Sequence, residues 1–156
     1  MASRLPRILP GEVTEIYFRC GITESDGFKN MNGSRIINLA EASGMYYNLR
    51  DGFLQFGIKN GVWAVTKEYF VQYHKPIKVF GRVKVISKNG WFTERSAFWH
   101  HQLYQKDKLC AEVFADVRVR DKNGSVSVFE VAKKMGMTLP QEEFHPMIVK
   151  KFFVDS

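Results

Sequence analysis

The sequence predicts an α+β fold in which an antiparallel sheet of about five strands wraps around one long helix. Apolar residues recur at three- and four-residue spacing over residues 34–51, which is typical of an amphipathic helix. Four strand-like segments follow between residues 62 and 120, and turn-forming sequences separate most of them. A group of small residues in the helix would let a sheet approach it closely: Ala40, Ala42, Ser43 and Gly44.

The first third of the chain supplies one strand, one loop and the start of the helix. Residues 1–11 are predicted to be an irregular lead-in, because proline and glycine interrupt them. Residues 12–20 are rich in Val, Ile, Tyr and Phe and predict a strand. Residues 21–33 carry several Gly and Asn residues and predict a loop. Asn32 or Ser34 can cap the following helix by accepting a hydrogen bond from a backbone N–H group.

Turn chemistry sets the boundaries of the remaining strands. Gly52 is predicted to end the helix. Asn60-Gly61 precedes the first of these strands. Asn-Gly pairs at 89–90 and 123–124 are strong hairpin signals between alternating segments, and Lys106-Asp107-Lys108 predicts one further turn. The predicted strands are residues 62–74, 77–87, 91–104 and 109–120.

The length of 156 residues is most simply that of a single domain covering residues 1–156. Its core is predicted at about residues 12–121, followed by a C-terminal extension over residues 122–156. Within the extension, residues 126–135 and 142–153 are predicted to form short helices.

The predicted sheet has one apolar face and one more polar face. Phe80 and Phe114 fall on the polar face, where they would suit a dimer contact. The apolar residues near the C-terminus are expected to cover an edge of the sheet. These residues are Ile148, Val149, Phe152 and Phe153.

Charge and cysteine content restrict the partners and the compartment. The formal net charge of +7 favours anionic partners, such as the phosphates of coenzyme A (CoA). Because the basic residues are scattered, we expect no nucleic-acid-binding tail. Cys20 and Cys110 show no metal-ligand spacing, and we expect both thiols to be reduced and partly buried. With no signal peptide and no apolar run of about 20 residues, the predicted location is cytoplasmic, without a transmembrane segment.

A loop motif before the helix carries the strongest functional signal. It resembles the signature of hotdog-fold acyl-CoA thioesterases of the 4-hydroxybenzoyl-CoA thioesterase-like family: Asp, three residues, His, one residue, Asn-Asn, then a helix with Glu in its second turn. Asp26, Asn32 and Glu41 match this pattern, whereas Asn30 replaces the His and Gly33 replaces the second Asn.

A second stretch supports the same resemblance. The sequence Tyr73-His74-Lys75-Pro76 is similar to the family's aromatic–x–x–Pro strand end, although Gly81-Arg82 replaces the Gly-Asp that often follows. The resemblance covers about residues 12–121. It implies a hotdog fold, a homodimer or tetramer with sites at the subunit interface, hydrolysis of acyl-CoA to free acid and CoA, and no metal or redox cofactor.

The resemblance also implies roles for individual residues. Asp26 would act as general base or nucleophile, Asn30 or Glu41 would orient the reacting groups, and backbone N–H groups at the helix start would hold the thioester oxygen. The catalytic candidates are Asp26, Asn30 and Glu41, and the substrate-binding candidates are Asn32, Gly33, Phe28 and Tyr73. Simpler interpretations remain open: Asp26-Gly27 can be only a turn, Asn32 only a helix cap and Glu41 only a solvated residue.

Basic residues around the third predicted strand are candidates for contacts with CoA phosphates, although a solvated strand face is the simpler interpretation for any single one. These candidates are Lys75, Arg82 and Lys88. No metal site is predicted, because His100 and His101 are adjacent on a strand and point to opposite faces. His74 and His145 have no carboxylate or cysteine at ligand spacing in the sequence.

Three other functions compete with hydrolysis. The missing His at position 30 and the Gly81-Arg82 pair favour a non-catalytic acyl-ligand or interaction protein on the same fold. A hotdog dehydratase is less favoured, because no His–carboxylate dyad is visible in the sequence. A basic β domain that binds nucleic acid would need aromatic residues stacked on an exposed strand face.

Overall fold

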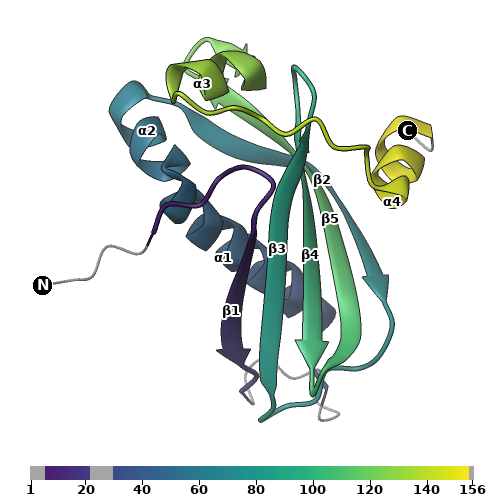
Figure 1. Ribbon diagram of the computed structural model, residues 1–156. Helices are drawn as coiled ribbons and strands as arrows, with labels where there is room; N and C mark the ends of the chain where they lie inside the picture. Colours follow the sequence, from purple (N-terminus) through teal and green to yellow (C-terminus); the bar gives the residue numbers. More distant parts are fainter. Residues whose placement is uncertain (1–5, 22–29, 155–156) are drawn as a thin grey trace, which may run out of the picture.

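The computed structural model describes residues 6–21 and 30–154. It confirms the predicted architecture, because one long helix lies in the hollow of an antiparallel sheet (Figure 1). The strands follow the order β1-β3-β4-β5-β2, and a short β6 pairs with the end of β5. Their bounds are Val13–Arg19 for β1, Trp63–Tyr73 for β2, Arg82–Phe92 for β3, Ala97–Gln105 for β4, Lys108–Asp121 for β5 and Gly124–Val126 for β6.

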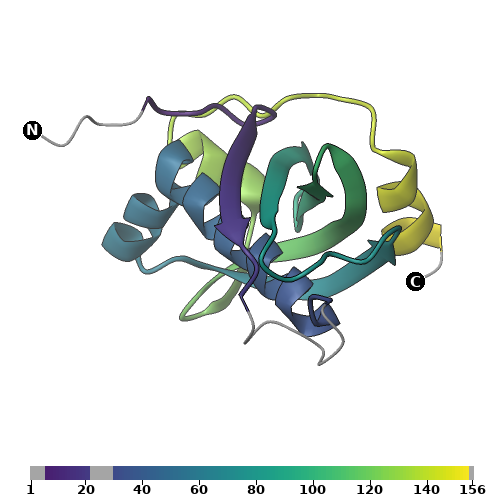
Figure 2. The same cartoon turned by 90° about the horizontal axis from the view of Figure 1, so that it is seen from below.

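Helix α1 spans Gly33–Asp51 and fills the concave side of the sheet (Figure 2). Asn32 caps it, because its side chain accepts a hydrogen bond from the Ser34 backbone N–H group. The helix buries a stripe of residues against the sheet at the spacing that the sequence predicts. These residues are Ile36, Leu39, Ala40, Ser43 and Tyr47.

A second helix, α2, follows α1 directly and spans Phe53–Asn60, where the sequence analysis predicts no helix. Gly52 ends α1 as predicted, with a φ of 92° that is open to glycine. The same residue is also the N-cap of α2. Phe53 and Phe56 of α2 then pack against a cluster formed by β5, β6 and α3. A helix of eight residues is marginal in water by itself, so this tertiary contact explains why α2 forms.

The predicted hairpin at Asn89-Gly90 is wrong. Strand β3 continues through this pair to Phe92, and a β-bulge between Asn89 and Trp91 absorbs the extra residue. The turn lies later, where the backbone N–H of Thr93 donates to the carbonyl of Ser96. Trp91 is buried beside Phe98 and Phe114 in the sheet's outer cluster, which holds this residue in the strand.

The start of β3 is also later than predicted. Residues 77–81 are not part of the strand, and Phe80 has a positive φ of 61°, which turns the chain before Arg82. The turn at Lys106-Asp107 is confirmed, with positive φ at both residues. Asn123-Gly124 also forms its predicted turn, after which β6 pairs back on β5.

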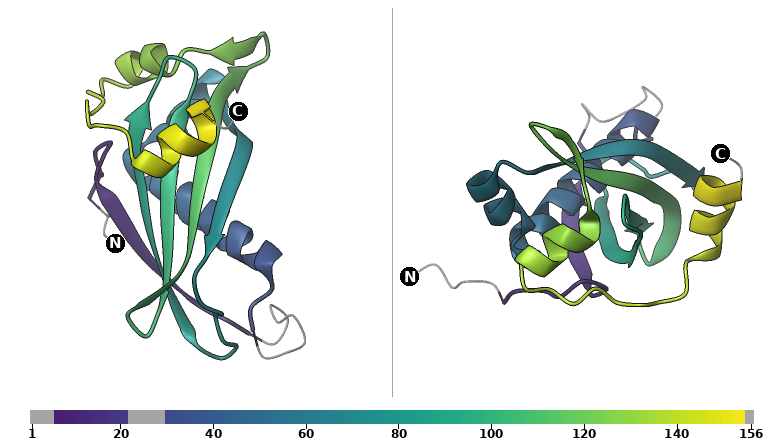
Figure 3. Two further views of the ribbon diagram at one scale, coloured as in Figure 1. Left: turned by 90° about the vertical axis from the view of Figure 1, so that its right-hand side faces the viewer. Right: turned by 90° about the horizontal axis from the view of Figure 1, so that it is seen from above.

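The C-terminal extension crosses to the opposite face of the sheet from α1. Helix α3 spans Val128–Lys134, and a second helical stretch consists of α4, Pro146–Ile148, and the π-helical turn η2, Val149–Val154. The left panel of Figure 3 shows this stretch in front of the sheet with α1 behind it. The predicted second helix begins late because Pro146 suits the first position of a helix and not its interior.

This arrangement corrects two expectations about the outer face. The C-terminal stretch covers the face of the sheet, not an edge, because Ile148 is fully buried against Trp91, Phe98 and Phe114. Phe114 is therefore 0% exposed within its own chain and not available for a dimer contact, whereas Phe80 is 67% exposed.

The inner core lies between α1 and the sheet and includes both Cys20 and Cys110, which are buried. Within residues 6–21 and 30–154, no helix is long and apolar enough to cross a membrane.

Candidate functional site

The first turn of α1 lies beside the end of β2. Asn32 accepts hydrogen bonds from the backbone N–H and the hydroxyl of Ser34, both at 3.0 Å. Gly33 has no side chain, and a Cβ placed there would lie 3.0 Å from the Tyr73 hydroxyl oxygen. No acidic residue occupies the first turn of α1, so no carboxylate within that turn offsets the partial positive charge of the helix start.

Asn30 joins the same end of the molecule. It forms an isolated antiparallel bridge with Lys78, and the neighbouring Met31 N–H donates to the Ile77 carbonyl at 2.6 Å. The structure therefore brings four sequence-predicted residues to one end of the sheet. These residues are Asn30, Asn32, Gly33 and Tyr73. Asp26 and Phe28 lie outside the described residues.

Glu41 belongs to a second polar group farther along α1. Its carboxylate accepts a hydrogen bond of 2.5 Å from the Tyr69 hydroxyl on β2, and Thr66 lies 3.2 Å from the same hydroxyl. Burial, assisted by the Glu41 carboxylate, raises the pKa of Tyr69 to about 12. Residues 33 and 41 are eight positions apart, which places them about 12 Å apart along the helix. Glu41 and the helix start of one chain therefore do not meet at one reacting atom.

A cavity of about 580 Å³ opens beside Glu41. Helices α1 and α2, strand β2 and the inner face of the sheet enclose it, and most of its wall is apolar. Its polar members are Glu41, Asn48, Thr66, Tyr69 and His101. A volume of this size is typical of a pocket for a small organic ligand.

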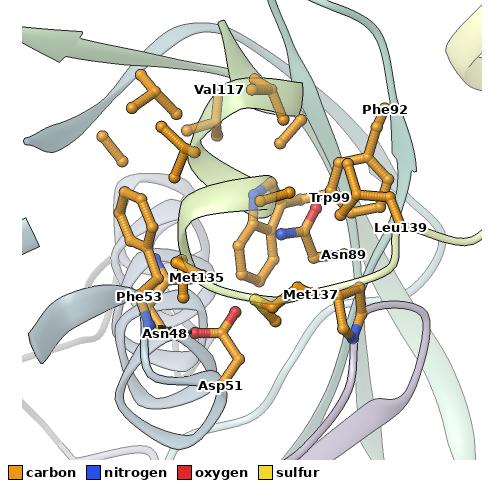
Figure 4. A pocket seen from close by; sticks show the side chains of 17 residues that line it. Asn48, Asp51, Phe53, Asn89, Phe92, Trp99, Val117, Met135, Met137 and Leu139 are labelled. Carbon is orange, nitrogen blue, oxygen red and sulfur yellow. Dashed lines mark hydrogen bonds between the residues drawn. The ribbon is translucent and has the colours of Figure 1, made fainter. Parts of the chain in front are cut away.

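A smaller cavity of about 70 Å³ lies between α1 and α3 (Figure 4). Both cavities share walls at Asn48, Phe53 and Trp99. Figure 4 shows the polar tips of Asn48, Asp51 and Asn89 among apolar side chains. Burial raises the pKa of Asp51 to about 6, although the Phe53 N–H donates to its carboxylate.

Three buried side chains form a hydrogen-bonded chain between α1 and the sheet, and one of them, His101, lines the large cavity. The Ser43 hydroxyl lies 2.6 Å from the Ser87 hydroxyl, which lies 2.6 Å from Nδ1 of His101. The His101 ring stacks on Trp99 at 5.6 Å and passes under Gly44, where a Cβ would lie 3.7 Å from the ring. Complete burial lowers the pKa of His101 to about 3, so its ring is neutral at physiological pH.

The predicted phosphate-binding residues do not form one cluster. Arg82 stacks over Tyr17 at 4.1 Å and lines a shallow hollow on the outer face with Tyr104. Lys88 lies six positions further along β3, about 20 Å away, and pairs with Glu142 at 2.7 Å. Lys75 follows the end of β2, close in the chain to Tyr73. Lys75 and Arg82 thus lie toward the end of the sheet that holds the start of α1, and Lys88 does not.

The outer face carries a separate histidine cluster. Glu112 accepts hydrogen bonds from His74 at 2.9 Å and His100 at 2.7 Å, so these histidines have a carboxylate partner that is distant in sequence. His145 lies 5.0 Å from the His100 ring. Among the described residues, no group of three His, Cys, Asp or Glu side chains has the geometry of a metal site.

Sequence reasoning missed the contributions of Tyr69 and His101 to the cavity, and that of Ser87, which hydrogen-bonds to His101. The only available signal was the group of small residues in α1, which indicates that bulky side chains pass under the helix. His101 is one of those side chains.

Known proteins with a similar fold have low sequence identity to this chain. No protein-family model and no curated protein matches this chain. Many solved structures do match. A hypothetical protein from Thermus thermophilus is similar with a TM-score of 0.73 and 14% identity, over 83% of this chain and 100% of that one.

The matching structures include several thioesterases. The 1,4-dihydroxy-2-naphthoyl-CoA thioesterase of Synechocystis aligns with a TM-score of 0.69 and 9% identity, over 80% of this chain and 95% of that one. The corresponding enzyme of Staphylococcus aureus aligns with a TM-score of 0.65 and 16% identity, over 82% and 92%. These matches, together with the architecture above, confirm the hotdog fold.

Proposed function

We propose that this protein hydrolyses acyl-CoA thioesters to a free acid and CoA. The observation that carries the proposal is the position of an apolar cavity of about 580 Å³ along the same helix whose N-terminus lies beside Tyr73 and has no acidic residue in its first turn. A thioester needs both parts: an apolar space for the acyl group and donors for the oxyanion that forms on its carbonyl. The names of the matching thioesterases support this assignment.

We propose that the working unit is a homodimer joined through β2. This strand pairs only with β5 among the described strands, so its other edge has unpaired backbone groups. Large apolar side chains rim the cavity next to this edge, with Met45 64%, Ile58 79% and Trp63 46% exposed. A second copy would cover them. It would also allow Glu41 of one chain to approach the helix start of the other, which the separation of about 12 Å within one chain does not allow.

In the proposed reaction, backbone N–H groups at Gly33 donate to the thioester carbonyl oxygen as negative charge develops there. Asp26 takes a proton from water while the water oxygen bonds to the carbonyl carbon. The C–S bond then breaks, and the CoA thiolate leaves and takes up a proton. Asn30 or Glu41 orients the water, and Asp26 acting directly as nucleophile is the other route that the carboxylate offers.

The CoA end of the substrate would lie near Lys75 and Arg82. Both belong to the end of the sheet where α1 starts, and Arg82 is held over Tyr17 in an exposed position. Lys88 fits this role less well, because its ammonium group is engaged by Glu142.

Thiol release from short, long and aromatic acyl-CoAs tests the proposal. We expect turnover by the wild type and a loss of at least about 100-fold in kcat for Asp26→Asn, with the fold and oligomeric state unchanged. Lys122→Gln, an exposed change outside the cavity, is the matched control. Turnover that survives in Asp26→Asn would remove Asp26 from the mechanism, and no turnover on any acyl-CoA would remove hydrolysis.

The alternative is a non-catalytic acyl-CoA or fatty-acyl binding protein. Asn30 favours it, because an amide cannot transfer a proton at neutral pH where the thioesterase pattern has a His. Saturable binding of acyl-CoA without thiol release would support this alternative.

A further inference from the structure

Strand β2 carries a bulge beside the large cavity, and this bulge changes which of its side chains face inward. The pairing of β2 with β5 shifts between Thr66 and Glu68, so Lys67 is an extra residue in the strand. Before the bulge, Ala64 and Thr66 line the cavity, and after it Tyr69 does. In a regular strand, positions 66 and 69 point to opposite faces of the sheet. The bulge therefore places the Thr66 and Tyr69 hydroxyls on one face, 3.2 Å apart.

The Tyr69 hydroxyl reaches from β2 to α1 and contacts the Glu41 carboxylate. The two oxygens are 2.5 Å apart, which is the short distance typical of a hydroxyl that donates to an ionised carboxylate. Burial, together with this hydrogen bond, raises the pKa of Tyr69 to about 12. The hydroxyl therefore keeps its proton at neutral pH and remains a donor to Glu41.

Tyr69 is held more firmly than the carboxylate that it contacts. Its ring packs against two clusters of buried residues between α1 and the sheet. Glu41 is an exposed residue of α1, and a glutamate side chain loses considerable rotational freedom when it is ordered. A donor on a packed ring therefore restricts the Glu41 carboxylate to one orientation at the wall of the cavity.

We propose that Tyr69 is a positioning residue that holds the Glu41 carboxylate in the orientation needed for thioester hydrolysis. This inference rests on the proposed acyl-CoA hydrolysis, in which Glu41 orients the attacking water, and it adds a residue that acts through Glu41 without touching the reacting atoms. A misplacement of about 1 Å in a reacting group can cost about 100-fold in rate. The bulge at Lys67 is then part of the site, because it turns Tyr69 toward α1.

Tyr69→Phe tests this role, because it removes the hydroxyl and keeps the ring. We expect kcat for acyl-CoA hydrolysis to fall about 10- to 100-fold and KM to stay within about 2-fold, since the hydroxyl acts on the carboxylate and not on the bound acyl group. Tyr47→Phe is the matched control. It also removes a tyrosine hydroxyl from the packing of α1, one that donates to the Glu12 carbonyl at 2.8 Å, and it should leave kcat unchanged.

A double-mutant cycle shows whether Tyr69 acts through Glu41. Glu41→Ala removes the acceptor, so adding Tyr69→Phe to this variant should lower kcat by less than about 2-fold. An equal loss of kcat in the presence and absence of Glu41 would mean that the hydroxyl only supports the local structure, and it would overturn the inference. Wild-type kcat in Tyr69→Phe would overturn it as well.

A titration of the tyrosine hydroxyls separates this inference from the proposed function, because it needs no turnover. With ¹³C on the ring carbon that bears the hydroxyl, NMR should show Tyr69 ionising at a lower pH in Glu41→Ala than in the wild type, since Glu41 contributes to its raised pKa. Equal ionisation in both proteins would overturn the role of Tyr69 whether or not thiol is released. A lower pKa in Glu41→Ala, without thiol release from any acyl-CoA by the wild type, would confirm the contact and overturn hydrolysis, and the catalytic role of Tyr69 with it.

Discussion

His100 and His101 are adjacent in the sequence but belong to two differently built faces of one sheet. His101 points inward, where it is neutral, hydrogen-bonded to Ser87 and open to a cavity. His100 points outward, where Glu112 accepts its hydrogen bond and the Phe114 ring stacks on it at 4.4 Å. The outer histidine is thus surrounded by partners from its own chain. The inner one lies at the wall of the large cavity, so the two faces of the sheet place adjacent histidines in different surroundings.

The largest expected effect concerns the outer face of the sheet. It tests whether the aromatic cluster there stabilises the fold as a buried core does. Phe114→Ala removes a ring that is 0% exposed and packs against Phe70 and Ile148, so we expect a loss of about 3–5 kcal/mol in the free energy of unfolding. Urea denaturation would measure it. Phe80→Ala is the control, with an expected change of less than about 0.5 kcal/mol because Phe80 is 67% exposed. A loss below about 1 kcal/mol for Phe114→Ala would show that the C-terminal stretch does not stay on this face.

The next effect depends on pH and concerns the inner face. The pKa of His101 falls from 6.5 to about 3 on folding, so between these values the folded state binds fewer protons than the unfolded state. Its contribution to stability is therefore complete above pH 6.5 and declines as the pH falls below that value. By pH 5 we expect a cost of about 2 kcal/mol. Measuring the free energy of unfolding of the wild type and of His101→Phe at pH 7 and pH 5 would isolate this cost. Equal pH dependence in both proteins would contradict the prediction.

Asp51, at the far end of the inner cavities, is expected to have the opposite pH dependence. Its pKa rises from 3.8 to about 6, so the cost of its buried charge is fully present above pH 6 and is relieved as the pH falls toward 3.8. Asp51→Asn keeps an oxygen for the Phe53 N–H group and removes the charge. We expect a gain of about 1–2 kcal/mol at pH 7 and a smaller gain at pH 5. Thermal unfolding at both pH values measures this gain, and destabilisation at pH 7 would show that Arg7 and the Phe53 N–H group outweigh the cost of burying the charge.

The smallest expected effect concerns the carboxylate of the outer cluster. Burial alone would raise the pKa of Glu112, but hydrogen bonds from His74 and His100 outweigh this effect and lower it. Its ionised form therefore stabilises the fold above its unfolded pKa, and this contribution is lost as the pH falls through the folded value. We expect Glu112→Gln to cost about 1 kcal/mol at pH 7 in urea denaturation, with the proposed thioesterase activity unchanged. Loss of activity would connect the outer face to the reaction.

Sequence patterns predicted the central helix and most strands because local periodicity and capping act within a few residues. The spacing of Ile36, Leu39 and Ala40 determines which side of α1 is buried, and Asn32 and Gly52 mark its ends. The Asn89-Gly90 prediction was wrong because packing of Trp91 in the outer cluster outweighs the turn preference of two residues. Helix α2 was missed for a similar reason, since its support comes from contacts with distant parts of the chain.

By itself, the sequence determined the wrapped-helix fold, the position of Asn32 and Gly33 at the helix start, and the opposite orientations of His100 and His101. Only the tertiary structure decided which partners those side chains meet. Ser43, Ser87 and His101 are separated by up to 58 positions in the chain, and no local pattern links them. They meet because strand pairing sets Ser87 beside His101 and helix packing brings Ser43 above both. Local residue preferences thus specify the elements, and long-range packing specifies the cavity.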